Sequence, residues 1–207
     1  MKEVFAVIGK MPLLGFSKTR LAKDIGENQA LALYHAMIKD FLAGLKQYLN
    51  NDICLYLYIT PDTPESFLFF QERLKASSIE NYKILFQPEL PFFNRLSYLF
   101  KEINKSEGES FVHLTGTDIP DFPFSFLKQA DTFENNSVSI GPDRDGGYYY
   151  IGTISKNDSI FAIEGLLDGT TSVFDATLRN INRHHLKVQI FPMWSDIDNI
   201  EDAHFCW

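Results

Sequence analysis

The sequence predicts an α/β fold, a three-layer α/β/α sandwich with a mostly parallel central sheet. Short apolar segments of strand length alternate along the chain with longer segments whose apolar residues recur at helical spacing. Alternation of this kind places the strands in one sheet with helices on both of its faces. No repeat, linker or shift of composition divides the chain, and we therefore expect one domain over residues 1–207.

The first expected element is a strand at 4–8, whose continuous apolar run is typical of a strand buried on both faces. From Ala30 to Tyr48 the apolar residues recur with the spacing of a helix. Asn28 is the expected N-cap of this helix, because Gly26 interrupts the chain just before it. The next expected elements are a strand at 53–59, a helix from Pro64 to near Leu74, a strand at 83–87 and a helix at 92–103.

The second half of the chain continues the alternation. The polar segment 104–110 is expected to be a surface turn, and the strand at 148–154 is expected to be antiparallel or peripheral. The other expected elements are strands at 111–115, 137–140 and 187–191, and helices at 123–133, around 159–167, at 172–183 and from Glu201.

Composition excludes several classes of function. The net charge of −8 and the pI near 5.1 argue against general binding to nucleic acid or to a membrane surface, which usually needs a basic face. Cys54 and Cys206 have no metal-binding spacing and form no disulfide framework. Nothing resembles a signal peptide, and no apolar run is long enough to span a bilayer. We therefore expect a soluble, cytoplasmic protein.

Four polar segments rich in glycine or proline follow predicted strands, at 9–20, 116–121, 141–147 and 196–199. Right-handed crossovers bring the carboxyl ends of parallel strands to one edge of the sheet. Ligands of open α/β sheets bind outside that edge. We therefore expect these four segments to meet in one cleft.

The first of these segments concentrates positive charge in an acidic chain. Lys10, Lys18 and Arg20 lie within twelve residues of Gly9, and Gly15 bends the chain between them. Backbone N–H groups near a helix start attract anions, and lysine and arginine add charge and a bidentate fork. The segment therefore predicts a phosphate site, with a solvated basic turn as the alternative. It matches neither the dinucleotide-binding nor the phosphate-loop pattern.

Carboxylates in two other segments are candidates for binding a divalent cation. Asp118 directly follows the strand at 111–115, and Asp196 and Asp198 point the same way if their segment is extended. Mg²⁺ usually takes one or two carboxylates, with waters and substrate phosphates filling its other positions. The alternatives are that Asp118 caps a following helix and that the other pair forms a turn and N-cap, for which Asn199 would serve as well.

A third constellation is Asp145-Gly146-Gly147. Adjacent glycines allow a ligand to approach the backbone closely, and Asp145 could bind acceptor hydroxyls or orient a sugar. The alternative is an ordinary hairpin turn. The three tyrosines that follow, 148–150, are expected to be core and strand surface more often than a stacking platform.

Four motifs occur in one order and together cover nearly the whole chain. They are Lys10-x-Pro12-x-x-Gly15-x-x-Lys18-Thr19-Arg20-Leu21-Ala22; Gly116-Thr117-Asp118-x-Pro120; Gly141-Pro142-x-x-Asp145-Gly146-Gly147-Tyr148-Tyr149-x-x-Gly152; and Asp196-Ile197-Asp198-x-x-Glu201-Asp202. With these motifs the chain resembles the DUF2064 family of bacterial glycosyltransferases, which have the GT-A (nucleotide-diphospho-sugar transferase) fold. The Asp-Ile-Asp ending is shared with related nucleotidyltransferases of molybdopterin and deazaflavin cofactor synthesis.

The resemblance implies a role for individual residues. Nucleotide binding is implied for Lys10, Gly15, Lys18, Thr19, Arg20, Gly146 and Gly147, with the three cations on the phosphates. Binding of Mg²⁺ or Mn²⁺ is implied for Asp118 and Asp198, and catalytic roles in the substrate cleft for Asp145 and Arg20.

The chain departs from the family pattern in two segments. Where the family has Leu-Gly-x-Arg-Met after the third strand, this chain has Leu90-Pro91-Phe92-Phe93-Asn94-Arg95-Leu96. The family often has the motif Trp-Gly/Ser-Thr before the terminal region. Here segment 168–173 keeps the threonine and a valine of that region but lacks the tryptophan. Both segments lie where an acceptor or a base would bind, so they bear on the substrate more than on the phosphate site.

These observations support three hypotheses. The first is a metal-dependent glycosyltransferase that uses a nucleotide-diphospho-sugar donor and an acceptor that the sequence does not identify. The second is a nucleotidyltransferase that joins an NTP to a phosphorylated small molecule and releases pyrophosphate. The third is a non-catalytic nucleotide-binding relative. Fold alone does not separate them.

Overall fold

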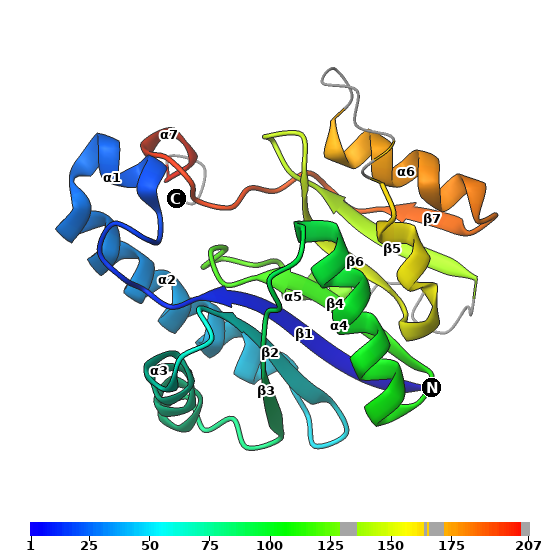
Figure 1. Cartoon of the computed structure of the whole chain (residues 1–207), viewed down its shortest axis with the longest axis horizontal. Helices are drawn as coiled ribbons and strands as arrows, with labels where there is room; N and C mark the ends of the chain where they lie inside the picture. Colours follow the sequence, from blue (N-terminus) through cyan, green and yellow to red (C-terminus); the bar gives the residue numbers. More distant parts are fainter. Residues whose placement is uncertain (129–135, 164, 166–171, 204–207) are drawn as a thin grey trace.

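The computed structural model of the chain describes residues 1–128, 136–163, 165 and 172–203. Its centre is a seven-stranded sheet in the order β3-β2-β1-β4-β6-β5-β7 (Figure 1). All neighbouring strands pair in parallel except β6, which is antiparallel to both β4 and β5. The strands are β1 Lys2–Lys10, β2 Cys54–Thr60, β3 Tyr82–Phe86, β4 Ser110–Gly116, β5 Ser137–Pro142, β6 Tyr148–Ile154 and β7 Lys187–Ile190.

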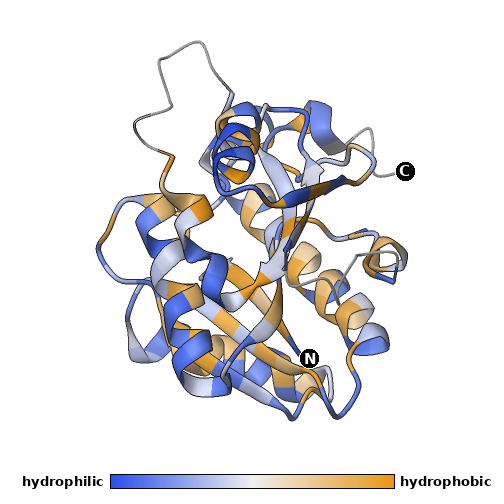
Figure 2. Cartoon of the chain, turned by 90° about the vertical axis from the view of Figure 1, so that its right-hand side faces the viewer, coloured by the Kyte–Doolittle hydropathy of each residue, from blue (hydrophilic) through white to orange (hydrophobic). Residues whose placement is uncertain are grey.

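Helices cover both faces of the sheet, so the predicted three-layer α/β/α fold is confirmed. Alternate side chains of β1 enter two separate cores: Phe5 and Val7 pack in one, Val4 and Ala6 in the other. Figure 2 shows hydrophobic residues along the central strands, and both hydrophobic and hydrophilic residues on the helices. The first core is covered by α2 Glu27–Tyr48, α3 Pro64–Ala76 and the short α5 Phe124–Leu127; the second is covered by α4 Phe92–Glu107, the 3₁₀ helix η1 Ser155–Phe161 and α6 Val173–Arg183.

Strand β6 was expected to be antiparallel or peripheral. It is antiparallel, but it is not peripheral. It lies between β4 and β5 in the interior of the sheet. Tyr150 and Ile151 are both buried, one in each core. A strand covered by helices on both faces and paired on both edges explains the apolar run at 148–154.

Two of the expected boundaries are wrong. Asn28 is not an N-cap, because it already lies in the first turn of α2, which begins at Glu27. Gly26 is both the C-cap of α1 Thr19–Ile25 and the N-cap of α2. The positive φ of 85° at Gly26 lets one residue end the first helix and start the second. Segment 104–110 is largely helix, since α4 continues to Glu107 and ends at Gly108.

Other elements match their expected positions or fall partly outside the description. The helix at 64–74 begins at Pro64 as expected and is capped by Thr63, whose hydroxyl accepts from Ser66 N at 3.2 Å. Helix α6 begins after Ser172, which caps it. Of the expected helix at 123–133, the described residues show α5, and residues 129–133 lie outside the description. The helix expected around 159–167 is wrong in its described part, where the 3₁₀ helix η1 ends at Phe161 and residues 162 and 163 are not helical. Cys54 is buried with a free thiol, and Cys206 lies outside the described residues.

The chain after β7 crosses the carboxyl edge of the sheet. This crossing segment, residues 191–199, hydrogen-bonds the ends of β5 and the loop after β4: Trp194 N donates to Pro142 O at 3.1 Å and Ile197 N to Asp118 O at 3.1 Å. It leads into α7 Ile200–Ala203, which lies beside α1 (Figure 1). The last and first parts of the chain therefore meet above the ends of the central strands. None of the described helices is both long and apolar enough to cross a membrane.

Candidate active site

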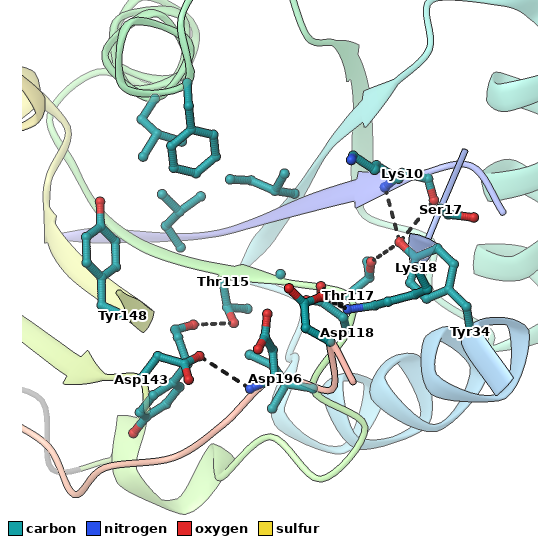
Figure 3. Close-up of a pocket in the computed structure, with 18 residues that line it drawn as sticks. Lys10, Ser17, Lys18, Tyr34, Thr115, Thr117, Asp118, Asp143, Tyr148 and Asp196 are labelled. Carbon is teal, nitrogen blue, oxygen red and sulfur yellow. Dashed lines mark hydrogen bonds and ion pairs between the residues drawn. The ribbon is translucent and has the colours of Figure 1, made fainter. Parts of the chain in front are cut away.

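A pocket of about 340 Å³ lies at the carboxyl edge of the sheet, between the loop after β1, the loop after β4 and the crossing segment. One part of its wall is charged or polar and another is apolar (Figure 3). The charged residues are Lys10, Lys18, Asp118, Asp143, Asp196 and Asp198, and the apolar part includes Ile8, Phe92, Leu96 and Leu114. All four segments expected to converge therefore meet there, and segment 141–147 contributes Asp143.

Lys18 is the centre of the charged wall. Its ammonium donates to Asp118 Oδ2 at 2.8 Å and to Asp198 Oδ1 at 2.7 Å, and its side chain is only 5% exposed. Burial alone would lower the pKa of Lys18, but the charges of the two aspartates raise it above its usual range. Arg20, whose side chain is 67% exposed at the rim, donates to Asp198 Oδ2 at 2.9 Å. The structure thus brings together four residues that the sequence separates by up to 180 positions.

Asp118 does not cap a helix. The residue at the N-cap position of α5 is Pro123, and α5 starts at Phe124. Asp118 is held instead at the end of β4, where Thr117 N donates to Ile8 O at 3.1 Å. A β-carbon on Gly116 would lie 2.5 Å from Asp118 Oδ1, so this glycine leaves room for the carboxylate. The alternative of a helix cap for Asp118 is therefore excluded.

The cap at the start of α7 belongs to Asn199, as one alternative anticipated. Asn199 Oδ1 accepts from Glu201 N at 2.8 Å and from Asp202 N at 3.1 Å. The carboxylate of Asp198 is thereby left to face Lys18 and Arg20. Burial favours the protonated form of Asp198, but the charges of Lys18, Arg20 and Lys10 outweigh it and lower the pKa.

Asp196 brings a third carboxylate to the same place. One oxygen each from Asp118, Asp196 and Asp198 lies within 4.8 Å of the others. Burial, and then the charges of Asp118 and Asp198, raise the pKa of Asp196 to about 8. Carboxylate oxygens are the ligands that Mg²⁺ and Mn²⁺ prefer. Three carboxylates that face one pocket therefore suit such an ion, and the pocket leaves room beside them for a phosphate.

Asp143 also lines the pocket, whereas Asp145 does not. Asp143 is buried, and its Oδ2 accepts from Asp196 N at 3.3 Å, which ties the crossing segment to the end of β5 (Figure 3). Burial raises the pKa of Asp143, and the nearby charge of Asp145 adds to the effect. Sequence reasoning did not select Asp143, although its place directly after a predicted strand was the signal that selected Asp118.

The hairpin turn between β5 and β6 accounts for the third constellation. Asp145 is exposed and its Oδ1 accepts from Gly147 N at 2.8 Å, while Gly146 has a φ of 90°. None of the three residues at 145–147 lines the pocket. The tyrosines after the turn serve mainly the core: Tyr150 is fully buried and bonds His113, whereas Tyr148 and Tyr149 reach the pocket wall.

The remaining expected site residues lie around the rim. Lys10 lines the pocket and its ammonium lies 5.6 Å from the centre of the Phe16 ring. Gly15, with a φ of 70°, and Thr19 are exposed in the loop and at the first turn of α1, outside the pocket lining. A residue that sequence reasoning missed is Tyr34, whose hydroxyl is within 2.9 Å of Thr117 Oγ1 and whose pKa burial raises to about 12.

One of the two segments that depart from the family pattern is described. Phe92 and Leu96 form the apolar wall of the pocket, at the start of α4. Arg95 donates to Gln87 Oε1 at 2.8 Å and stacks over the ring of Phe92. In the other segment, residues 168–171 lie outside the described part of the chain.

The sheet order and the charged pocket at its carboxyl edge define a protein of the nucleotide-diphospho-sugar transferase fold. A solved structure from Desulfovibrio desulfuricans G20, described as a "putative nucleotide-diphospho-sugar transferase", is 27% identical, with a TM-score of 0.80 over 98% of this chain and 85% of that one. 4-Diphosphocytidyl-2C-methyl-D-erythritol synthase, 7% identical, has a TM-score of 0.57 over 98% and 95% of the two chains. The glycosyltransferase GlyE of Streptococcus pneumoniae TIGR4, 12% identical, has a TM-score of 0.51 over 92% and 45%. The last two likenesses concern the fold alone.

The chain belongs to the DUF2064 family. Residues 45–163 match the family described as "Uncharacterized protein conserved in bacteria (DUF2064)", which confirms the resemblance inferred from the motifs. The matched region contains Asp118 and Asp143 but neither Lys18 nor Asp198. No curated protein matches the sequence.

Proposed function

We propose that this protein is a glycosyltransferase that binds a nucleotide-diphospho-sugar donor together with a divalent cation. The observation that carries the proposal is the meeting of Lys18 and Arg20 with Asp118 and Asp198 at one pocket. Cations beside carboxylates at the carboxyl edge of a sheet suit a diphosphate held partly by protein and partly through a metal. The likeness to the structure from Desulfovibrio desulfuricans supports a sugar nucleotide as the donor.

Each side of the pocket has its own role in this proposal. Lys10, Lys18 and Arg20 bind the diphosphate, and Asp118, Asp196 and Asp198 hold Mg²⁺ or Mn²⁺. When bound, such an ion neutralises phosphate charge and stabilises the departing nucleoside diphosphate. The three basic side chains add to that stabilisation by bringing positive charge to the departing diphosphate.

The acceptor lies against the other part of the wall. Asp143 is a further carboxylate that lines the pocket, and we assign to it the role first expected for Asp145. It accepts the proton of the acceptor hydroxyl, and its raised pKa makes it a stronger base than an exposed aspartate. Phe92 and Leu96 give this side an apolar surface against which a sugar ring or an apolar acceptor can pack.

A panel of nucleotide-diphospho-sugars tests the proposal. Purified protein is incubated with UDP-, GDP-, dTDP-, CDP- and ADP-sugars in Mn²⁺ or in EDTA, and binding by thermal shift and donor turnover by chromatography are measured. We expect at least one donor to raise the melting temperature and to be turned over when Mn²⁺ is present, but not in EDTA. The Asp118→Asn variant should lose both effects. No binding of any donor with or without metal would refute the proposal.

Two other outcomes identify the alternative functions. Release of pyrophosphate from an NTP without any sugar nucleotide identifies a nucleotidyltransferase, which the same charged groups would suit. Nucleotide binding that EDTA leaves unchanged, with no turnover of any donor, identifies a non-catalytic binding protein.

A further inference from the structure

The ammonium of Lys18 lies where two of the candidate metal ligands face each other. It contacts Asp118 Oδ2 at 2.8 Å and Asp198 Oδ1 at 2.7 Å, so one side chain joins the loop after β4 to the crossing segment. At 5% exposure, the side chain has almost no contact with solvent. The free protein thus supplies its own cation to these carboxylates.

The backbone of Lys18 is held in an uncommon conformation to make these contacts. Lys18 has φ 51° and ψ 43°, in the left-handed region, at the N-cap position of α1. Residues with a β-carbon adopt this region at an energetic cost. Its side chain makes no capping hydrogen bond that would offset that cost. We therefore attribute the compensation for this backbone cost to the two ion pairs that Lys18 forms.

A divalent cation and the Lys18 ammonium compete for the same oxygens. Mg²⁺ needs its oxygen ligands at about 2.0–2.1 Å in a near-octahedral arrangement. An ammonium already bound to Asp118 Oδ2 and Asp198 Oδ1 occupies one lone pair of each oxygen, and its charge repels a second cation at that distance. Asp118 and Asp198 can hold the divalent ion together only when Lys18 has left them.

An ammonium that leaves the aspartates needs another anion within reach. Tyr34 offers none, because the centre of its ring lies 5.9 Å from the ammonium and its hydroxyl is already bonded to Thr117 Oγ1 and Lys10 O. A buried ammonium without a partner is costly. The pocket beside Lys18 is the space that a diphosphate would fill, and its oxygens would receive the ammonium.

We propose that Lys18 exchanges partners: its ammonium bridges Asp118 and Asp198 in the free protein, and it moves to the diphosphate when a divalent cation takes its place between the two aspartates. Metal and diphosphate then bind cooperatively, and each raises the affinity for the other. This inference rests on the cation and diphosphate sites of the proposed function, and it adds that neither site is fully open without the other ligand.

Mn²⁺ titration without any phosphate ligand tests the first half of the exchange. Free Mn²⁺ is followed by electron paramagnetic resonance in wild type, Lys18→Met and Arg20→Met. We expect Lys18→Met to bind Mn²⁺ at least tenfold more tightly than wild type. Arg20→Met also removes one positive charge from Asp198, but at the exposed rim, and we expect less than a threefold change. Lys18→Gln is the second variant should Lys18→Met fail to fold.

Pyrophosphate titration in EDTA tests the other half. Asp198→Asn frees Lys18 from one partner, and we expect pyrophosphate to bind at least fivefold more tightly than to wild type by isothermal calorimetry. Asp121→Asn is the matched control, because exposed Asp121 lies in the same loop as Asp118 but outside the pocket lining, and it forms no ion pair with Lys18 among the described contacts. We expect the control to stay within twofold of wild type.

The outcomes separate the inference from the proposed function. Equal or weaker Mn²⁺ binding by Lys18→Met, or equal pyrophosphate affinities in Asp198→Asn and Asp121→Asn, would overturn the exchange while leaving the transferase proposal in place. If wild type and all variants bind neither Mn²⁺ nor pyrophosphate at millimolar concentrations, both fail together.

Discussion

Charged residues that the sequence separates widely are recognisable when each follows a strand. Lys18, Asp118 and Asp198 were selected from the sequence, and the structure places both carboxylates within hydrogen-bond distance of the Lys18 ammonium. The ammonium bridge itself could not be predicted, because it depends on the left-handed backbone of Lys18. The choice of Asp145 over Asp143 came from a motif, whereas burial and the contact with Asp196 distinguish Asp143 only in three dimensions.

The two aspartates of the hairpin provide a matched pair of variants. We expect Asp143→Asn to lower donor turnover by at least a hundredfold, the usual size of a general-base contribution. Asp145→Asn should retain turnover within about threefold of wild type, because its exposed carboxylate supports only the turn. Steady-state rates with the best donor of the panel measure both. Equal losses in the two variants would contradict the assignment of Asp143.

Gly116 offers a test of the space around Asp118. In Gly116→Ala the new β-carbon would meet Asp118 Oδ1 at 2.5 Å and force the carboxylate away from Lys18. We expect the free energy of unfolding to fall by about 1 kcal/mol. This value is at the low end for an overpacked site, because the carboxylate of Asp118 can rotate away from the new methyl group. Denaturation in urea measures it. Gly165→Ala, where no atom lies within 4 Å of the new β-carbon, is the control, and equal stability of the two variants would show that Asp118 is free to move.

At the scale of elements, the alternation of strands and helices could be predicted, but some ends could not. The expected turn at 104–110 is helical because distant residues hold the end of α4. Glu107 accepts from Lys2 and from Lys83, and the Tyr56 hydroxyl donates to Glu107 Oε1 at 2.6 Å. Local propensity carries no information about three partners that lie at positions 2, 56 and 83.

This carboxylate cluster predicts a pH dependence of stability. Although burial opposes ionisation, hydrogen bonds from Lys2, Lys83 and Tyr56 lower the pKa of Glu107 to about 2, below its ordinary 4.5. Its contribution is therefore complete above about pH 4.5 and disappears as pH falls towards 2. Because both lysines are partly exposed, we expect about 1–2 kcal/mol.

Urea denaturation of wild type and Glu107→Gln between pH 7 and pH 2.5 measures that contribution. The two proteins should differ most near neutral pH and converge in acid. A difference that is constant over the whole range would mean that the ionised carboxylate contributes nothing to the fold.

At the scale of the whole molecule, the class of fold followed from the sequence, but the order of the strands did not. The interior place of antiparallel β6 depends on both of its faces being covered, by Tyr150 in one core and Ile151 in the other. The sequence predicted that segment 196–199 reaches the cleft, but not that residues 191–199 cross the edge of the sheet, because this path depends on hydrogen bonds to residues distant in the sequence, Pro142, Asp143 and Asp118.

The two cores share one sheet, and we expect them to unfold together. Phe41 and Phe100 are both fully buried, on opposite faces. Phe41→Ala and Phe100→Ala should each lower the free energy of unfolding by about 3–5 kcal/mol. Calorimetry should show a single transition in both variants. Two transitions, of which each variant shifts only one, would instead indicate two independently folding parts.

The crossing segment also has a consequence for synthesis. The bridge joins Lys18, near the beginning of the chain, to Asp198, 180 positions later. A nascent chain emerging from the ribosome can form β1 and its neighbours early. Until Asp198 has been translated, however, Asp118 is the one of these two ion-pair partners that Lys18 can contact. The charged groups of the pocket therefore come together only after nearly all of the sheet has had the opportunity to form.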